Sequence, residues 1–347
     1  MRSGHFVESY GTLVALSDSR AVWTWASLLL LALLALPLLA GNYVLTLATT
    51  ICLTAIGTIG LNLITGTTGL ISLGHAGFLA VGAYTVGILL TDYQWPLAAA
   101  LPAAGFVAAA VGLVVGVPSL RLKGLYLAIT TLAFAFIVNH VILYAEPLTH
   151  GPNGIFLKRT DFLGIPIGTD RALYYFTLAV AVLMTLAALN ILRTRVGRAW
   201  MAIRDHDIAA RVMGINLTTY KLAAFVVSSF FTGIAGALLA LQIRFVNVDV
   251  FNLLLSIEAL AMIIFGGLGS VAGAILGAAF LVLLPEVIRE VFAFAGGGTQ
   301  AFSQYVFQVR ALAYGVVIVF FLRFEPHGLM GLWRDTKKYW LNWPLAR

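Results

Sequence analysis

Long stretches without a charged side chain set the pattern of this chain. No Asp, Glu, Lys or Arg occurs between Arg20 and Asp92, and further charge-free runs cover 93–120, 124–145, 172–192, 222–243, 259–285 and 291–309. One helix that crosses a hydrocarbon core about 30 Å thick takes roughly 20 residues. The runs therefore predict helical spans at about 22–40, 43–65, 75–91, 95–117, 124–145, 172–192, 219–242, 252–268, 271–292 and 306–323.

Composition agrees with this pattern. Hydrophobic residues make up 61% of the chain and charged residues only 10%, far outside the range of soluble domains. The predicted fold class is therefore an all-α polytopic membrane protein with about ten transmembrane helices. The single cysteine, Cys52, lies in an apolar run, so a disulfide within the chain and a thiolate metal site are both ruled out.

Basic residues are distributed unevenly over the two sides that these spans define. Ten spans put both termini on one side, and that side holds 15 of the 21 Lys and Arg residues. The other side holds Lys158, Arg159, Arg171, Arg244, Arg289 and Arg310. By the positive-inside rule, both termini and the 193–218 loop are cytoplasmic. The positive net charge is then a topology signal and predicts no nucleic-acid partner.

This topology divides the chain into three parts. Residues 1–21 form a cytoplasmic N-terminal segment, and 22–323 form the transmembrane domain with its cytoplasmic loop 193–218. Residues 324–347 form a tail whose tryptophan, tyrosine and lysine residues are typical of an anchor at the lipid interface. The largest external loop, 146–171, is equally compatible with a docking surface for an outside partner and with a plain connector.

Two glycine-rich segments interrupt the apolar sequence. Residues 66–77 contain four glycines, three hydroxyl side chains and a histidine, and residues 266–270 read Gly-Gly-Leu-Gly-Ser. Unwound backbone at membrane depth is tolerated only inside protein or beside a water-filled cavity, and such breaks often mark transport pathways. Glycines at 269, 273 and 277 recur every four residues, which favours close packing between helices.

Few polar side chains lie inside the predicted spans. The candidates for the translocation pathway are Asn62, Ser72, His75 and Glu258. An ionisable group in a membrane is costly, so each one is a functional candidate. Glu258 is expected within one turn of the external end of its span, where it stays hydrated, and pathway lining and helix packing are both open to it. His75 follows the first break and favours a capping or packing role.

Charged and apolar residues alternate with helical spacing over 195–215. Met201, Ile208, Val212 and Ile215 fall on one side of a helix. Asp207 is spaced to meet Arg204 and Arg211, and Gly214 is placed to end the helix in a left-handed C-cap. The pattern predicts a short amphipathic helix at the membrane surface that contacts something outside the membrane. A solvated loop is the alternative.

Motifs for chemistry within the chain are missing. No lysine follows a glycine, so there is no phosphate-binding loop for a nucleotide, and no H-E-x-x-H, Cys/His cluster or G-x-S-x-G segment occurs. We therefore expect a transport subunit and not an enzyme, with no metal or cofactor bound by this chain. Any energy from ATP would come from partner subunits.

Several ordered motifs resemble the permeases of branched-chain amino acid ABC transporters, and specifically their longer, LivM-like subunit. They are Gly-Leu-Asn-Leu-Ile-Thr-Gly at 60–66, Gly-Leu-Ile-Ser-Leu-Gly-His-Ala-Gly-Phe at 69–78, Arg-Leu-Lys-Gly-Leu-Tyr-Leu-Ala-Ile-Thr-Thr-Leu at 121–132, Gly-Pro-Asn-Gly at 151–154, the 197–216 loop, Ser-Ile-Glu-Ala-Leu at 256–260 and Phe-Gly-Gly-Leu-Gly-Ser at 265–270. The resemblance covers about 45–325.

The resemblance implies a ten-span subunit of a bacterial inner-membrane importer, with both termini cytoplasmic. Its partners would be a LivH-like second permease subunit, two cytoplasmic ABC ATPase subunits that hold ATP and Mg, and a periplasmic or lipid-anchored solute-binding protein. The 198–215 helix would be the coupling helix, which contacts an ATPase subunit through Arg198, Met201, Arg204, Asp207, Ile208, Ala209, Ala210, Arg211 and Gly214. The general permease signature is Glu-Ala-Ala followed by Gly, and here Ile208 stands in place of the glutamate.

Three other functions fit parts of the pattern. A urea or short-amide ABC permease shares these motifs. A secondary transporter driven by protons or sodium would use Glu258 or His75. A membrane scaffold without transport activity would explain neither the helix breaks nor the amphipathic loop.

Overall fold

The computed structural model describes residues 20–294, except Lys123, 158–160 and Leu163, together with 328–342 and the isolated positions 312, 315, 316, 319 and 323. In chain order the helices are α2 (Arg20–Leu39), α3 (Asn42–Leu61), the π-helix η1 (Asn62–Gly66), α4 (His75–Thr91), α5 (Leu97–Ser119), α6 (Leu125–Tyr144), α7 (Glu146–Thr149), the 3-10 helix η2 (Gly151–Asn153), α8 (Asp170–Arg193), α9 (Arg195–Asp205), α10 (Asp207–Val212), α11 (Leu217–Ile243), the 3-10 helix η3 (Val248–Val250), α12 (Leu253–Gly266), α13 (Val271–Phe294) and α15 (Gly328–Asn342). Four two-residue strands, β1 (Ile155–Phe156), β2 (Asp161–Phe162), β3 (Ile165–Pro166) and β4 (Phe245–Val246), lie in the loops.

Helices of membrane-spanning length dominate the described part of the chain. Seven are long and apolar enough to cross a membrane, namely Asn42–Gly66, Leu97–Ser119, Leu125–Tyr144, Asp170–Arg193, Leu217–Ile243, Val248–Gly266 and Val271–Glu290. Two shorter apolar helices, Thr24–Leu39 and His75–Thr91, match the predicted spans 22–40 and 75–91. The prediction of an all-α polytopic membrane protein is confirmed. The tenth predicted span, 306–323, and the predicted segment 1–21 up to Ser19 lie outside the described residues.

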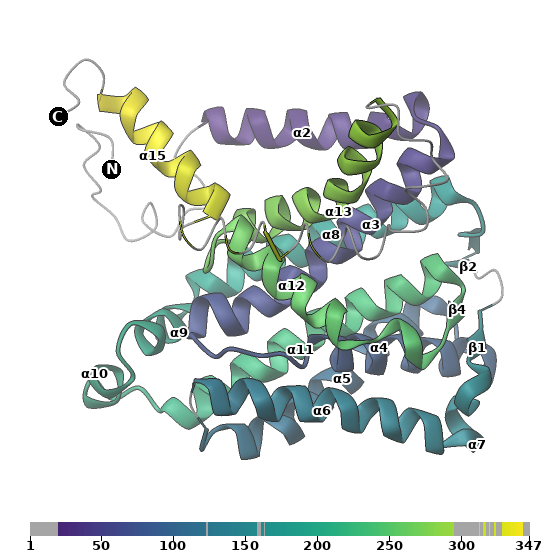
Figure 1. Ribbon diagram of the computed structural model, residues 1–347, viewed down its shortest axis with the longest axis horizontal. Coiled ribbons are helices and arrows are strands. Elements are labelled where there is room, and N and C mark those ends of the chain that lie inside the picture. The colour runs from purple at the N-terminus through teal and green to yellow at the C-terminus, as the bar shows by residue number, and fades with distance from the viewer. Residues whose placement is uncertain are drawn as a thin grey trace.

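The two ends of the helix bundle carry different elements. In Figure 1, α9, α10 and α15 lie at its left end, and α7, β1 and β4 lie at its right end. Strands β1 and β4 pair antiparallel, with Ile155 opposite Val246, so the 146–171 loop is tied to the segment that follows α11. The loop 193–218 and the tail helix therefore share one end of the bundle, opposite the 146–171 loop.

Helix α11 lies at the centre of the packing. It is the most deeply buried of the seven long helices, and it packs against α3, α4 and α5. A Cβ atom on Gly82 of α4 would collide with the backbone of Gly233 in α11, and one on Gly236 would collide with the Leu79 carbonyl. Glycine is required at these crossings because the two backbones are in direct contact.

Helices α12 and α13 are held together by a similar contact. A Cβ atom on Gly273 would meet the Gly266 carbonyl, and one on Gly277 would meet the Met262 carbonyl. The predicted packing role of the glycine series is therefore confirmed for 273 and 277. Gly269 differs, because it lies in the break between the two helices with φ at +81°. The glycine that interlocks with Gly273 is instead Gly266.

Candidate functional site: the junction of two helix breaks

The first predicted break is shorter than the glycine pattern suggests. Helix α3 continues into the π-helix η1, and the backbone leaves the helical conformation only over 69–74 before α4 starts at His75. Gly69 has φ at +75°, a value that glycine adopts without strain. A π-helical turn inside an α-helix is rare and is often found at functional sites.

Neighbouring helices satisfy the backbone of this break. The Leu73 N–H donates to Thr131 Oγ1 of α6 at 2.9 Å, and the Ala76 N–H donates to Ser256 Oγ of α12 at 2.9 Å. The Thr65 hydroxyl donates to the Leu70 carbonyl at 3.1 Å. The break is therefore fixed from α6 and α12, as a membrane-embedded break must be when no water is available to pair its polar groups.

Two glycines open the second break. Helix α12 ends at Gly266 and α13 begins at Val271, with φ at +117° for Gly267 and +81° for Gly269. Residues other than glycine rarely adopt such positive values of the backbone angle φ. The Ser270 hydroxyl accepts a hydrogen bond from the Gly273 N–H at 3.1 Å, which caps the first turn of α13.

Asn62 joins the two breaks. Its Nδ2 donates to the Ser270 carbonyl at 2.8 Å, and its Oδ1 accepts from the Gly269 N–H at 2.9 Å. The side chain is buried, and a Cβ atom on Gly66 would collide with Asn62 Oδ1 and the Gly269 amide nitrogen. The structure thus joins the two predicted breaks through the Asn62 side-chain amide, whose nitrogen and oxygen both form hydrogen bonds to the second break.

A residue of the 193–218 loop also contacts this junction. Arg204 of α9 donates from Nη1 to the Gly66 carbonyl at 2.6 Å. A Cβ atom on Gly69 would lie 3.5 Å from Arg204 Cγ, and one on Gly269 would collide with Nη1. The aliphatic stem of Arg204 therefore lies against Gly69 and its guanidinium lies beside Gly269, so this side chain contacts both breaks.

The predicted single helix over 198–215 is wrong. The chain forms two helices, α9 and α10, which meet at an extended residue, His206, with φ −155° and ψ 103°. The bend buries Ala210 beside Ile203 and Leu217 in a small apolar cluster, which a straight helix would not bring together. The predicted left-handed C-cap at Gly214 is confirmed, with φ at +86°.

Four large apolar side chains in α9, in α10 and directly after α10 lie on the outside of the chain. Met201 is 42% exposed, Ile208 76%, Val212 81% and Met213 83%. We call these four residues the α9–α10 apolar surface. Three residues of the predicted apolar face, Met201, Ile208 and Val212, are therefore exposed, while the fourth, Ile215, is partly buried.

The remaining residues predicted for the coupling contact lie around this surface. Arg198, Ala209 and Arg211 are exposed, Asp207 is half-buried and Ala210 is buried. The Arg198 guanidinium donates to the Arg193 carbonyl at 2.7 Å, within its own segment. On the inner side of α9, Trp200 is fully buried and donates from Nε1 to the Tyr220 carbonyl at 2.8 Å, which fixes α9 to α11.

The candidate pathway residues are all buried. Ser72, His75 and Glu258 are each less than 10% exposed, as is Asn62. The expectation that Glu258 stays hydrated near the end of its span is wrong, because it lies in the second turn of α12 and packing between helices covers it. Their part in a pathway stays a prediction.

Sequence reasoning missed two side chains that hold the first break. Thr131 and Ser256 accept hydrogen bonds from its backbone, and both are fully buried. Hydroxyl residues in apolar spans usually bond to their own helix, so only the pairing of helices could have singled these two out. Thr131 does donate to the Ala128 carbonyl of its own helix at 3.0 Å while it accepts from Leu73.

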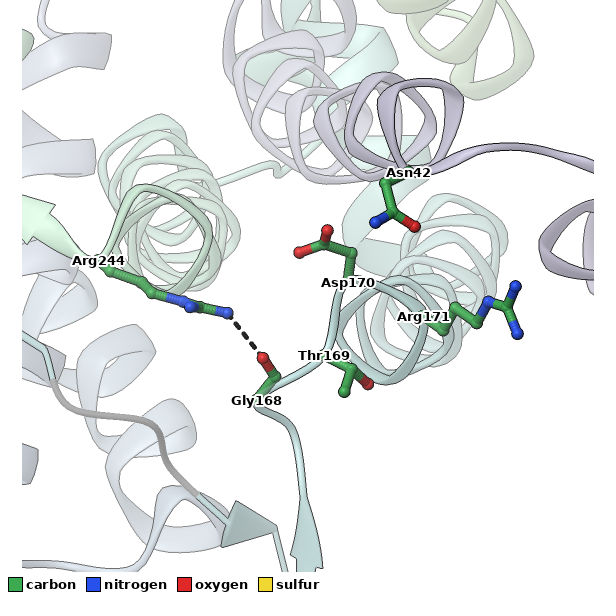
Figure 2. A pocket seen from close by; sticks show the side chains of 6 residues that line it. All are labelled: Asn42, Gly168, Thr169, Asp170, Arg171 and Arg244. Atoms are coloured by element: carbon green, nitrogen blue, oxygen red, sulfur yellow. Dashed lines mark hydrogen bonds between the residues drawn. The ribbon is translucent and has the colours of Figure 1, made fainter.

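A polar hollow lies at the other end of the bundle. It encloses about 520 Å³ and is lined by Asn42, Gly168, Thr169, Asp170, Arg171 and Arg244. Figure 2 shows Arg244 reaching toward Gly168, whose carbonyl accepts from Arg244 Nη2 at 2.9 Å, while Arg171 points away. The 146–171 loop is thus fastened to α11 at its end and surrounds a polar concavity.

Comparison with known proteins places this architecture in a family. Residues 43–322 match the model of the branched-chain amino acid transport system permease component. The chain is 34% identical to the high-affinity branched-chain amino acid transport system permease protein LivM of Escherichia coli, over 89% of this chain and 75% of the relative.

Weaker similarity extends to other transport permeases. The chain is 25% identical to BraD of Pseudomonas aeruginosa, a high-affinity branched-chain amino acid transport system permease protein, over 83% of this chain and 93% of the relative. It is 33% identical to the autoinducer 2 import system permease protein LsrC of Salmonella typhi over 38% of this chain and 37% of the relative. The match across the two breaks and the amphipathic loop shows that the chain belongs to the family of branched-chain amino acid transport permeases.

Proposed function

We propose that this chain is a membrane-spanning subunit of an ATP-driven, binding-protein-dependent importer of branched-chain amino acids in the bacterial inner membrane. The solute class follows the names of LivM and BraD, which the chain resembles over most of its length. The nucleotide is bound by partners, because the chain has no phosphate-binding loop. The complex would contain a LivH-like second permease subunit, two cytoplasmic ATPase subunits with ATP and Mg, and a binding protein.

The α9–α10 apolar surface is the observation that carries this proposal. Its most exposed members are Ile208 and Val212 in α10 and Met213 directly after it, and α10 lies at the left end of the bundle in Figure 1. Exposed apolar side chains that gather on one short element mark a site of protein contact. Five arginines over 193–211 favour the cytoplasmic side by the positive-inside rule, where an ATPase subunit is available.

Energy would pass through this contact as a movement of packed helices. Closure of the ATPase dimer on ATP would displace α9 and α10, and the buried helices would follow as rigid bodies. Trp200 ties α9 to α11, the central helix of the bundle, so a displaced α9 carries the core with it. Solute selection would fall mainly to the binding protein, which docks at the opposite end on the 146–171 loop and the polar hollow.

Reconstitution tests this function. Proteoliposomes that hold this chain, the second permease subunit and both ATPase subunits should accumulate radiolabelled leucine only with ATP inside and liganded binding protein outside. Vesicles with this chain alone should take up nothing under a proton or sodium gradient. Uptake by the chain alone on an ion gradient would contradict the proposal and make it a secondary transporter.

A further inference from the structure

Arg204 differs from the other charged residues of α9 and α10 in what it contacts. Its Nη1 donates to the Gly66 carbonyl at 2.6 Å, 138 residues away in sequence. Its aliphatic stem covers Gly69, and its guanidinium fills the space beside Gly269. Arg198, on the same helix, donates instead to the Arg193 carbonyl, five residues away in its own segment. Arg204 thus faces the membrane domain.

The accepting carbonyl is suited to a cation. Gly66 is the last residue of η1, where carbonyl groups carry the partial negative charge of a helix C-terminus. A charge-assisted hydrogen bond to such a carbonyl is stronger than one between neutral groups. A side chain at position 269 would push the guanidinium away, so glycine at this position keeps the approach open.

The hydrogen bonds continue from Arg204 into both breaks. Gly66 is one helical turn from Asn62, which bonds to the Gly269 N–H and the Ser270 carbonyl. Close packing leaves no slack between Gly66, Asn62 and Gly269, because a single methyl group on Gly66 would overlap the other two. A displacement of the guanidinium therefore cannot move the first break without moving the second.

We infer that Arg204 is the positioning residue that transmits movement of α9 to the two helix breaks, so that they rearrange together during transport. This inference rests on the proposed function. The α9–α10 apolar surface contacts the ATPase subunit, and Arg204, one helical turn from Met201 on α9, passes the displacement inward through its hydrogen bond to the Gly66 carbonyl. The two sets of residues should therefore give different defects when they are changed.

Substitutions of Arg204 in the reconstituted complex test this inference. Arg204→Met keeps the aliphatic stem and removes the charge and the donor, and Arg204→Lys keeps the charge. Arg195→Met is the matched control, because Arg195 is an exposed arginine in the first turn of the same helix and is not among the residues predicted to contact the ATPase subunit. We expect Arg204→Met to retain its ATPase subunits and basal ATP hydrolysis. Leucine uptake per ATP hydrolysed should fall about tenfold, within the usual range of coupling between sites. Arg204→Lys should recover part of it, and Arg195→Met should match the wild type.

Two results would overturn the inference. Uptake per ATP that is unchanged in Arg204→Met would remove Arg204 from the transmission path. Loss of the ATPase subunits in parallel with uptake would assign Arg204 to the subunit contact instead. In either case the wild-type complex still transports, whereas failure of the proposed function would leave the wild type without ATP-dependent uptake.

Hydrogen exchange in the wild-type complex gives a second measurement that does not depend on the folding of a variant. Amides in 66–74 and 267–270 should change their exchange rates together between the ADP-bound complex and the complex held with a non-hydrolysable ATP analogue. A change confined to one segment, or to neither, would also overturn the inference.

Discussion

Gly66→Ala is expected to reduce leucine uptake by more than tenfold. The added methyl group would overlap Asn62 Oδ1 and the Gly269 amide nitrogen, so the amide bridge between the two breaks has to open. Overpacking costs about 1–3 kcal/mol, and a buried polar group left without its hydrogen bond costs about as much again. Uptake by the reconstituted complex, normalised to the amount of complex in the vesicles, is the measurement.

Gly87→Ala is the matched control for this substitution. Gly87 lies in α4, and a Cβ atom there would make an ordinary contact of 3.5 Å with Ile155. Alanine is more favourable than glycine in a helix by about 1 kcal/mol, so this variant should be as stable as the wild type or more so. If Gly66→Ala took up leucine at the wild-type rate and unfolded at the wild-type midpoint temperature, the packing described for the junction would be contradicted.

Val212→Asp is expected to release the ATPase subunits from the complex. The side chain is 81% exposed, so the change should leave the fold of the permease subunit intact. In the assembled complex the same carboxylate would be buried without a partner against an apolar groove of the ATPase subunit. Changing a central interface residue in this way often costs about 2 kcal/mol or more of binding free energy, which is roughly a thirtyfold loss of affinity. ATPase subunits that co-purify with the permease in detergent are the quantity to measure.

Thr336→Asp supplies the matched control. Thr336 is exposed on α15, at the same end of the bundle, and the substitution adds the same charge outside the α9–α10 apolar surface. The ATPase subunits should co-purify with this variant as with the wild type. Equal retention in Val212→Asp would show that the surface does not hold an ATPase subunit.

The helical spans could be predicted from the sequence because lipid demands about 20 apolar residues in a row, and that requirement is local. The breaks could be located for a similar reason, since four glycines within 66–77 do not favour a helix. Gly214 could be predicted as a helix end because glycine adopts the left-handed conformation that often closes a helix without steric strain.

The junction could not be predicted, because it depends on contacts between distant segments. Asn62 and Ser270 are 208 residues apart, and nothing in either segment indicates the other. The bend at His206 likewise depends on the burial of Ala210 against Leu217, which helical spacing does not report. Burial of Glu258 was missed because the sequence gives its depth along α12 but not the helices around it.

The bend also changes how the surface helix should be tested. A continuous helix over 198–215 would make proline at Ala209 a break in the middle of the helix. With α10 beginning at Asp207, Ala209 lies in the first turn, where a backbone N–H has no partner within the helix. Proline is tolerated best in that part of a helix, so a charge at Val212 is the sharper perturbation.

Cross-linking from Ile208 tests the contact with the ATPase most directly. Cys52 is the only cysteine of the chain, so a Cys52→Ser background with Ile208→Cys carries a single reactive thiol on α10. Ile208 is 76% exposed, and Phe156 in β1, at the opposite end of the bundle, is 70% exposed. We expect a cross-linker at position 208 to capture an ATPase subunit, and Phe156→Cys to capture none. Labelling of position 208 by a membrane-impermeant reagent added outside intact cells would contradict the cytoplasmic contact.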